Sequence, residues 1–275
     1  MLARIALCLI VLLLTCSVSA GELNELCTTE INSKEKSERV FNANITGIGI
    51  VTACGLTHWD YFSRSPHSTS EGWFGNASDD GGADKLGHLY TSYVAAHGLS
   101  ALYESWCFTK HDAAIYGALS SFAVLGYMEL GDSFSDYGFS REDFWMNALG
   151  SVAGYCLYEN TDLARKIDIR WQDGFHPTGS DFTTDYENST YLLAVKFNGF
   201  EATRSSFLKH LELHIGYYAR GFYDPVINKE RNLYIGLGIN LTDWFRRKGY
   251  RKTAVLFNYM QLPGTYLAAE KDRNQ

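Results

Sequence analysis

The hydrophobic pattern of this chain changes near Asp162, and this change limits the folds that the chain can adopt. Before this point the chain carries long uncharged runs, such as residues 113–128 and 144–158, which are typical of packed helices. After it, apolar and polar residues alternate, as in residues 211–217, which is typical of strands with one apolar face. The sequence therefore predicts an α+β fold, with an N-terminal helical bundle of about four helices followed by a C-terminal antiparallel β-meander.

The ends of these runs give expected boundaries. Ser140 and Asp143 are spaced almost as in a helix-capping box, which predicts a helix start between them. The uncharged runs are shorter than the roughly 20 residues of a perpendicular membrane span, so we favour a bundle over membrane-embedded helices. Helices are predicted at residues 45–56, 84–106, 112–130 and 141–158, and strands at 191–197, 211–217, 233–241 and 254–259. The expected segments are a signal peptide (1–20), a polar leader (21–43), a helical domain (44–170) and an antiparallel β segment (171–275).

The first residues have the features of a secretory signal peptide. Arg4 precedes an apolar run at residues 5–14, and Val18-Ser19-Ala20 offers a small-residue cleavage pattern. Lipidation at Cys16 is an alternative, although Thr15 replaces the small residue that lipobox signals prefer. We therefore expect an exported protein in the periplasm or at the outer-membrane periphery of a Gram-negative bacterium.

Charge and cysteine content fit that compartment. The net charge of −7 becomes −8 when Arg4 is removed with the signal peptide, so nucleic acid is not an expected partner. Four cysteines remain, which permits two disulfides in an oxidising compartment without showing their pairing. The remaining cysteines are Cys27, Cys54, Cys107 and Cys156.

Polar residues within the apolar helices form the candidate site. They recur at spacings of three or four, so that each helix presents one polar face. If the helices are neighbours, these faces meet in one cluster, in which His88, Glu129 and Asp143 could bind a divalent metal. The same residues could instead form a structural network of hydrogen bonds. The complete cluster is Asp84, Lys85, His88, Glu129, Asp132, Asp143 and Asn147.

Several motifs follow one another in the helical part of the chain, including Gly82-Ala83-Asp84-Lys85-Leu86-Gly87-His88, Glu129-Leu130-Gly131-Asp132-Ser133-Phe134-Ser135 and Met146-Asn147-Ala148-Leu149-Gly150. In this order they resemble the YfiM-like family of predicted bacterial periplasmic lipoproteins. The order of Asp, Lys, His, Glu, Asp and Asn is also similar, more distantly, to VanZ-like membrane proteins linked to glycopeptide resistance. The resemblance implies an envelope location and does not imply a particular reaction.

Two functions follow as expectations. The first is a non-enzymatic periplasmic or outer-membrane-associated structural or binding module, whose partners are the membrane or other envelope components. The alternative is a metal-assisted hydrolase or transferase that acts on a lipid-linked or cell-wall substrate through the His/Asp/Glu cluster. The sequence contains no Walker loop, dinucleotide fingerprint or Gly-x-Ser-x-Gly motif, so the common catalytic templates give no further guidance.

Overall fold

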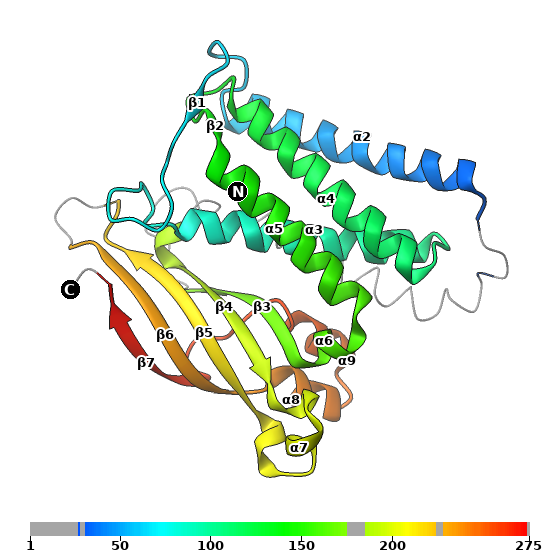
Figure 1. The fold of residues 1–275 in the computed structure, drawn as a ribbon, viewed down its shortest axis with the longest axis vertical. Helices are drawn as coiled ribbons and strands as arrows, with labels where there is room; N and C mark the ends of the chain where they lie inside the picture. The colour runs from blue at the N-terminus through cyan, green and yellow to red at the C-terminus, as the bar shows by residue number, and fades with distance from the viewer. Residues whose placement is uncertain (1–26, 28–30, 175–184, 224–227, 274–275) are drawn as a thin grey trace. The chain divides into compact units, whose positions relative to one another are not determined.

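The chain forms two compact units, which can be followed separately in Figure 1. The computed structural model describes Cys27 and residues 31–174, 185–223 and 228–273, so the expected signal peptide and Cys16 lie outside the described residues. The helical unit contains residues 31–71 and 91–159, and the sheet unit contains residues 72–90 and the chain from residue 160 onward. The predicted α+β class is confirmed.

Long helices form the helical unit, and hydrogen bonds between them fix their directions. Lys36 contacts Asp112 and Asn44 contacts Ser120, so the first helix runs beside α4 in the same direction. A bond from Ser151 to Ser121 places α5 on α4 as well. The helices are α2 (Ser33–His58), α3 (Ala83–Ser105), which begins in the sheet unit, α4 (Lys110–Asp132) and α5 (Arg141–Glu159). Two short strands, β1 (Ser68–Thr69) and β2 (Phe139–Ser140), pair in parallel.

Polar side chains cap three of these helices. The side-chain oxygens of Asn32, Thr109 and Ser140 accept hydrogen bonds from backbone N–H groups in the first turns of α2, α4 and α5. Such caps satisfy N–H groups that have no partner within the helix. The capping start predicted at Ser140 is therefore confirmed.

A disulfide and an aromatic cluster join the start of α2 to the turn between α3 and α4. Cys27 is bonded to Cys107, while Cys54 and Cys156 carry free thiols among the described residues. Beside the disulfide, Tyr103 and Phe108 are buried and their rings are stacked. Of the pairings that the four cysteines permitted, the structure thus contains one.

The sheet unit contains a five-stranded antiparallel sheet, whose strands follow one another in chain order as a meander. Each strand pairs with its predecessor in the chain, from green β3 to red β7 in Figure 1. The strands are β3 (Ile167–Asp173), β4 (Ser189–Lys196), β5 (Leu211–Arg220), β6 (Glu230–Ile239) and β7 (Tyr266–Asp272). Short helices connect them: α6 (Thr161–Lys166), η1 (Tyr186–Asn188), η2 (Phe197–Gly199), α7 (Glu201–Arg204), η3 (Phe207–His210), α8 (Leu241–Arg247) and α9 (Arg251–Leu256).

The two faces of this sheet differ in an unusual way. One face carries buried charged residues, including Arg170 and Glu212, together with Leu192 and Tyr234. The opposite face is apolar, and its side chains on β6 are exposed. Gln261 bonds both to the backbone of β3 and to the Arg170 side chain, so the segment that leads to β7 helps to cover the polar face.

Three local predictions differ from the structure. The strand predicted at residues 254–259 is wrong, because α9 (Arg251–Leu256) occupies its first part and the Phe257 ring stacks on Phe245. Helix α2 begins at Ser33, within the expected polar leader. Strands β3 and β7 were not predicted, and β3 already starts at Ile167, before the expected beginning of the β segment.

Candidate functional site

The polar residues singled out from the sequence are divided between the two units. The convergence of all seven residues in one cluster stays a prediction. Asp84, Lys85 and His88 lie in the sheet unit, at the start of α3, and Glu129, Asp132, Asp143 and Asn147 lie in the helical unit.

A buried ion pair marks the start of α3. Lys85 Nζ lies 2.5 Å from Asp84 Oδ2, and both side chains are almost completely buried, as is His88. Burial, together with the negative charge of Asp84, raises the pKa of nearby Asp80 to about 6. The lysine in this first helical turn opposes the helix dipole, and its carboxylate neighbour offsets that cost.

In the helical unit, Glu129 and Asn147 belong to a chain of buried hydrogen bonds. Asn147 Nδ2 donates to Glu129 Oε1 over 3.0 Å, and Asn147 Oδ1 accepts from Ser92 Oγ over 2.9 Å. The carbonyl of Ser92 accepts from Ser121 Oγ, which in turn accepts from Ser151 Oγ. The chain links α3, α4 and α5 through small polar side chains, so Glu129 and Asn147 act in holding the three helices together.

The helical unit contains a second acidic group, of which the sequence analysis predicted Asp143 but not Glu71. A carboxylate oxygen of Glu71 lies within 4.8 Å of one of Asp143, and Asp143 is buried. Beside them, Ser70 Oγ donates to Glu142 Oε1. Glu71 precedes the predicted helices in a loop of polar residues, and nothing in its spacing connects it with Asp143.

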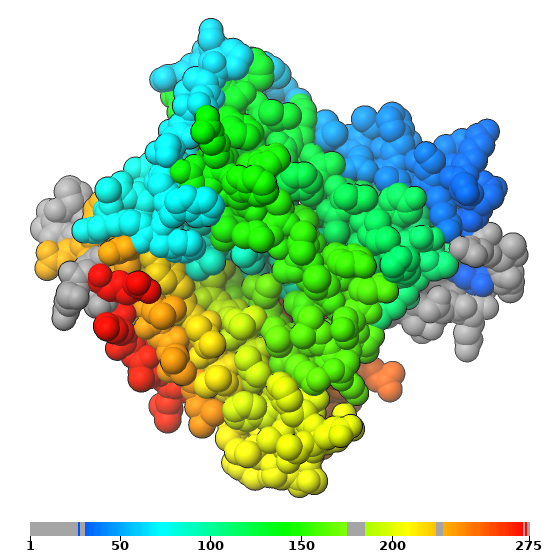
Figure 2. Space-filling model, in the orientation of Figure 1, coloured from blue at the N-terminus to red at the C-terminus, as the bar shows by residue number. Residues whose placement is uncertain are grey.

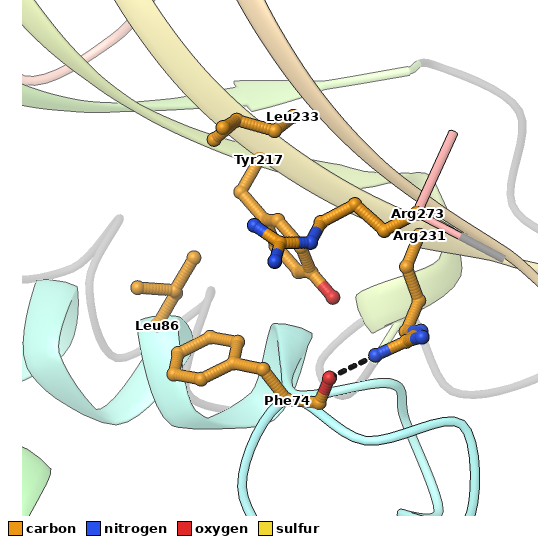
Figure 3. A pocket seen from close by; sticks show the side chains of 6 residues that line it. All are labelled: Phe74, Leu86, Tyr217, Arg231, Leu233 and Arg273. Atoms are coloured by element: carbon orange, nitrogen blue, oxygen red, sulfur yellow. Dashed lines mark hydrogen bonds between the residues drawn. The ribbon is translucent and has the colours of Figure 1, made fainter. Parts of the chain in front are cut away.

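The sheet unit contains an open cleft of about 540 Å³ with mixed chemistry. Figure 3 shows Phe74 and Leu86, from the segment around the start of α3, facing Tyr217 and Leu233 of the sheet. Arg231 on β6 and Arg273 just after β7 extend their guanidinium groups into the same space. The cleft thus combines an apolar wall with two cationic groups.

Hydrogen bonds fix the walls of this cleft. Arg231 donates to the carbonyl oxygen of Phe74, as the dashed line in Figure 3 marks. The Tyr217 hydroxyl donates to the carbonyl of Gly81, and burial raises the pKa of Tyr217 to about 12. Tyr217 therefore remains a neutral wall of the cleft at physiological pH, and the rings of Phe74 and Tyr217 meet edge to face.

An apolar strip continues from the cleft along β6. Leu233, Ile235, Leu237 and Ile239 alternate along the strand and are exposed on the same face, Ile235 to 57 %. From Leu233 to Ile239 the strip extends about 20 Å. Rows of exposed aliphatic side chains are typical of surfaces that bind apolar partners.

The other notable polar group of the sheet unit is closed to solvent. Arg170 makes two hydrogen bonds to Glu212, of 2.6 and 3.0 Å, and one of 2.8 Å to Asp168. Lys196 donates to Asp168 and His214 bonds to Glu212. Burial raises the pKa of Glu212, but the charge of Arg170 and the hydrogen bonds from His214 and Arg170 outweigh it and hold this pKa below its usual range.

This buried group and the cleft were both missed from the sequence. Asp168 and Arg170 alternate with Ile167 and Ile169, a pattern that ordinarily places the polar residues in solvent. The cleft residues come from distant parts of the chain, and no motif links them. Only the alternation of Leu233 with its neighbours indicated an apolar face on that strand.

Comparison with known proteins agrees with the envelope location. Residues 70–159 match the model of a family described as predicted periplasmic lipoprotein (DUF2279). The matched segment includes all seven polar residues that the sequence singled out, although it covers only about a third of the chain. No curated protein and no solved structure matches the chain. The predicted location, in the periplasm after export, is confirmed, and the chain is similar over this segment to an uncharacterised periplasmic lipoprotein family.

Proposed function

We propose that the chain is a non-enzymatic binding module of the bacterial envelope, and that its sheet unit binds an anionic amphiphile. The observation that carries this proposal is the cleft, in which two arginines stand beside an apolar wall. Guanidinium groups bind carboxylate and phosphate oxygens through paired hydrogen bonds. The resemblance of the sequence to YfiM-like and VanZ-like proteins supports an envelope location for this module.

The strip on β6 supplies the second half of the ligand's binding surface. It begins at Leu233 in the wall of the cleft and continues to Ile239, so an apolar tail can lie along it while the anionic head meets Arg231 and Arg273. The ligand class is therefore an anion attached to a long hydrocarbon chain. Fatty acids and lysophospholipids both have this chemistry, with a carboxylate or a phosphate as the head.

The first prediction tests this cleft by competition. We expect a dansyl-labelled fatty acid to bind the full-length mature protein and to be displaced by palmitate or by lysophosphatidylglycerol. Monopalmitoyl glycerol has the same tail without the charge, and it is expected to compete at least tenfold less well. Arg273→Gln should weaken binding about tenfold, the effect of one charge-assisted hydrogen bond. The relative strength of the two anionic competitors distinguishes carboxylate from phosphate recognition.

Arg251→Gln is the matched control, because Arg251 is an exposed arginine at the start of α9. It should bind the labelled fatty acid with unchanged affinity. Equal competition by the uncharged glyceride, or unchanged binding by Arg273→Gln and Arg231→Gln alike, contradicts the proposed role of the cleft.

A second candidate function, metal-assisted hydrolysis, is favoured by the carboxylate pair of Glu71 and Asp143 in the helical unit. Oxygen atoms at such a separation can share one divalent cation. Against it, Glu129 is engaged by the amide of Asn147, which suits a structural role.

The second prediction separates these two candidates by elemental analysis. Under the binding-module proposal, protein purified without chelators should hold far less than one equivalent of manganese, iron or zinc, and should take up none on titration. One bound equivalent that is lost in both Glu71→Gln and Asp143→Asn, and kept in the exposed control Asp60→Asn, supports the hydrolase instead.

A further inference from the structure

Large apolar side chains cover the outside of three helices in the helical unit. Each of them is at least 52 % exposed, although such residues are normally buried. On α5 they recur at spacings of four and three, which places them in one stripe along the helix. We call this surface the apolar belt, and it consists of Phe41, Ile45, Ile50 and Leu56 on α2, Leu119 and Leu130 on α4, and Trp145, Leu149 and Val152 on α5.

The three helices form one continuous layer. Thr52 bonds to the Tyr127 hydroxyl, which extends the contact of α2 with α4 along their length. On its other side α4 contacts α5, so α4 lies between α2 and α5. The outer surfaces of α2, in blue, and of α4 and α5, in green, can be followed in Figure 2. On α2, Phe41, Ile45 and Leu56 lie on one flank and Ile50 lies on the other, so this helix exposes apolar side chains on both flanks.

Charged residues are confined to the ends of these helices. No Asp, Glu, Lys or Arg occurs in residues 40–57 of α2, 113–128 of α4 or 144–158 of α5. The most apolar windows of α2 and α4 have mean hydropathies of 1.4 and 1.3. Only 11 % of that window in α2 is buried within the protein, whereas the core helix of a soluble protein is mostly buried.

Small and polar residues occur at the close contacts of α3 with α4 and α5. A Cβ atom added to Gly117 would lie 2.1 Å from Ser100 Oγ, and one added to Gly154 would lie 2.5 Å from the Cβ of Ala96. Small residues that let helices approach closely, joined by serine and asparagine hydrogen bonds, are typical of helices that pack within a lipid environment. The interior of the helical unit thus holds polar groups beside apolar ones such as Leu125 and Met128, while large apolar side chains also lie on its outside.

We propose that the apolar belt is inserted into a phospholipid bilayer, with lipid acyl chains as its partner. The uncharged stretches of α4 and α5 are shorter than the roughly 20 residues of a span, so the helices lie along the membrane. Amphipathic helices in this position bury their apolar face to a depth of about 5–10 Å. Trp145 suits the boundary between headgroups and acyl chains. A protein partner would not require the length and hydropathy of α2 and α4, or the absence of charge from all three helices.

The third prediction tests the position of the belt with single cysteines in a Cys54→Ser/Cys156→Ser background, which keeps the Cys27–Cys107 disulfide. A bimane label at Leu149→Cys should shift to shorter emission wavelengths when vesicles of phosphatidylethanolamine and phosphatidylglycerol are added. Nitroxide groups on the acyl chains should quench it. Ser37 is exposed in the charged first part of α2, and the same label at Ser37→Cys should show neither change.

Negative charges introduced into the apolar belt give an independent measurement of membrane binding. Ile45→Glu and Leu149→Glu should each lower flotation of the full chain with these vesicles about tenfold, and Ser37→Glu should not. Circular dichroism of each variant checks that the helices are retained. Absence of quenching at Leu149→Cys overturns the proposal, and so does a Leu149→Cys label that is shielded without lipid in a sedimenting dimer, since a second copy would then cover the belt. Neither result affects fatty-acid binding in the cleft, which is measured without vesicles.

Discussion

Replacement of Arg170 by methionine is expected to lower the free energy of unfolding by about 3–5 kcal/mol. Arg170 is completely buried and binds Glu212 through two hydrogen bonds and Asp168 through a third. Lys196 donates to Asp168 and to the carbonyl of Ala164, so it can balance the charge of Asp168. Removal of the guanidinium group therefore leaves a buried carboxylate without its main partner. Urea unfolding followed by far-UV circular dichroism measures the change.

Two further variants test whether charge or packing is responsible. Arg170→Met/Glu212→Leu removes both members of the pair and should recover much of the loss, because no unpaired charge remains. Arg165→Met breaks an exposed pair with Asp162 and should leave the free energy of unfolding nearly unchanged, because solvent screens this pair. A double variant as unstable as Arg170→Met would show that the shape of the side chains, and not the charge, is what the sheet requires.

The pKa of Glu212 fixes the pH range in which this contribution acts. Because the folded-state pKa is lowered, the stabilisation is present at neutral pH and is lost as the pH falls through that lowered value. Measurements at neutral pH therefore report the full effect of Arg170→Met.

The helices could be predicted from the sequence because their signals are local. The uncharged runs in α4 and α5 are bounded by charged residues, and Ser140 supplies a cap at one end. The exception is α2, whose first turns are polar and carry no hydrophobic period. These turns are held by a partner distant in the chain, since Lys36 pairs with Asp112 and Arg39 bonds to the carbonyl of Trp106. No window of the sequence around Ser33 contains that information.

The strands were harder to predict, because an alternation of apolar and polar residues fits more than one structure. In residues 254–259 a short alternation suggested a strand, yet a run of six residues also fits a helical turn, and Phe257 is buried against Phe245 in that form. In β3 the alternation was present but its polar half is the buried half. Burial of Arg170 on β3 depends on Glu212 on β5, and β4 lies between these two strands.

The sequence indicated which polar residues the helices carry, but it indicated only part of their contacts. The sequence placed Glu129 and Asn147 on facing helices, and the two side chains are hydrogen-bonded. It could not indicate Ser92, Ser121 or Ser151, because serines of this kind are common in helices and gain a role only through contact. The sequence also gave no indication that Arg231 and Arg273 line a cleft, because the cleft depends on which strands become neighbours.

The Cys27–Cys107 disulfide is another contact between distant parts of the chain, and its removal is expected to have a large effect on stability. Cys27→Ser/Cys107→Ser is expected to lower the free energy of unfolding by about 2–4 kcal/mol. The bond joins residues 80 positions apart, so it removes many conformations from the unfolded chain. Without it, the start of α2 is held by Lys36, Arg39 and the cluster around Tyr103.

Urea unfolding with and without a thiol reductant measures this contribution, and reduction of the unaltered chain should reproduce the double variant. Cys156→Ser is the matched control, because this thiol is exposed and free, and its loss should change stability by less than about 0.5 kcal/mol. Retained stability after reduction would mean that α2 docks through its side chains alone. A loss confined to α2 in hydrogen exchange, with α4 and α5 still protected, would show that the disulfide secures α2, of whose most apolar window only 11 % is buried.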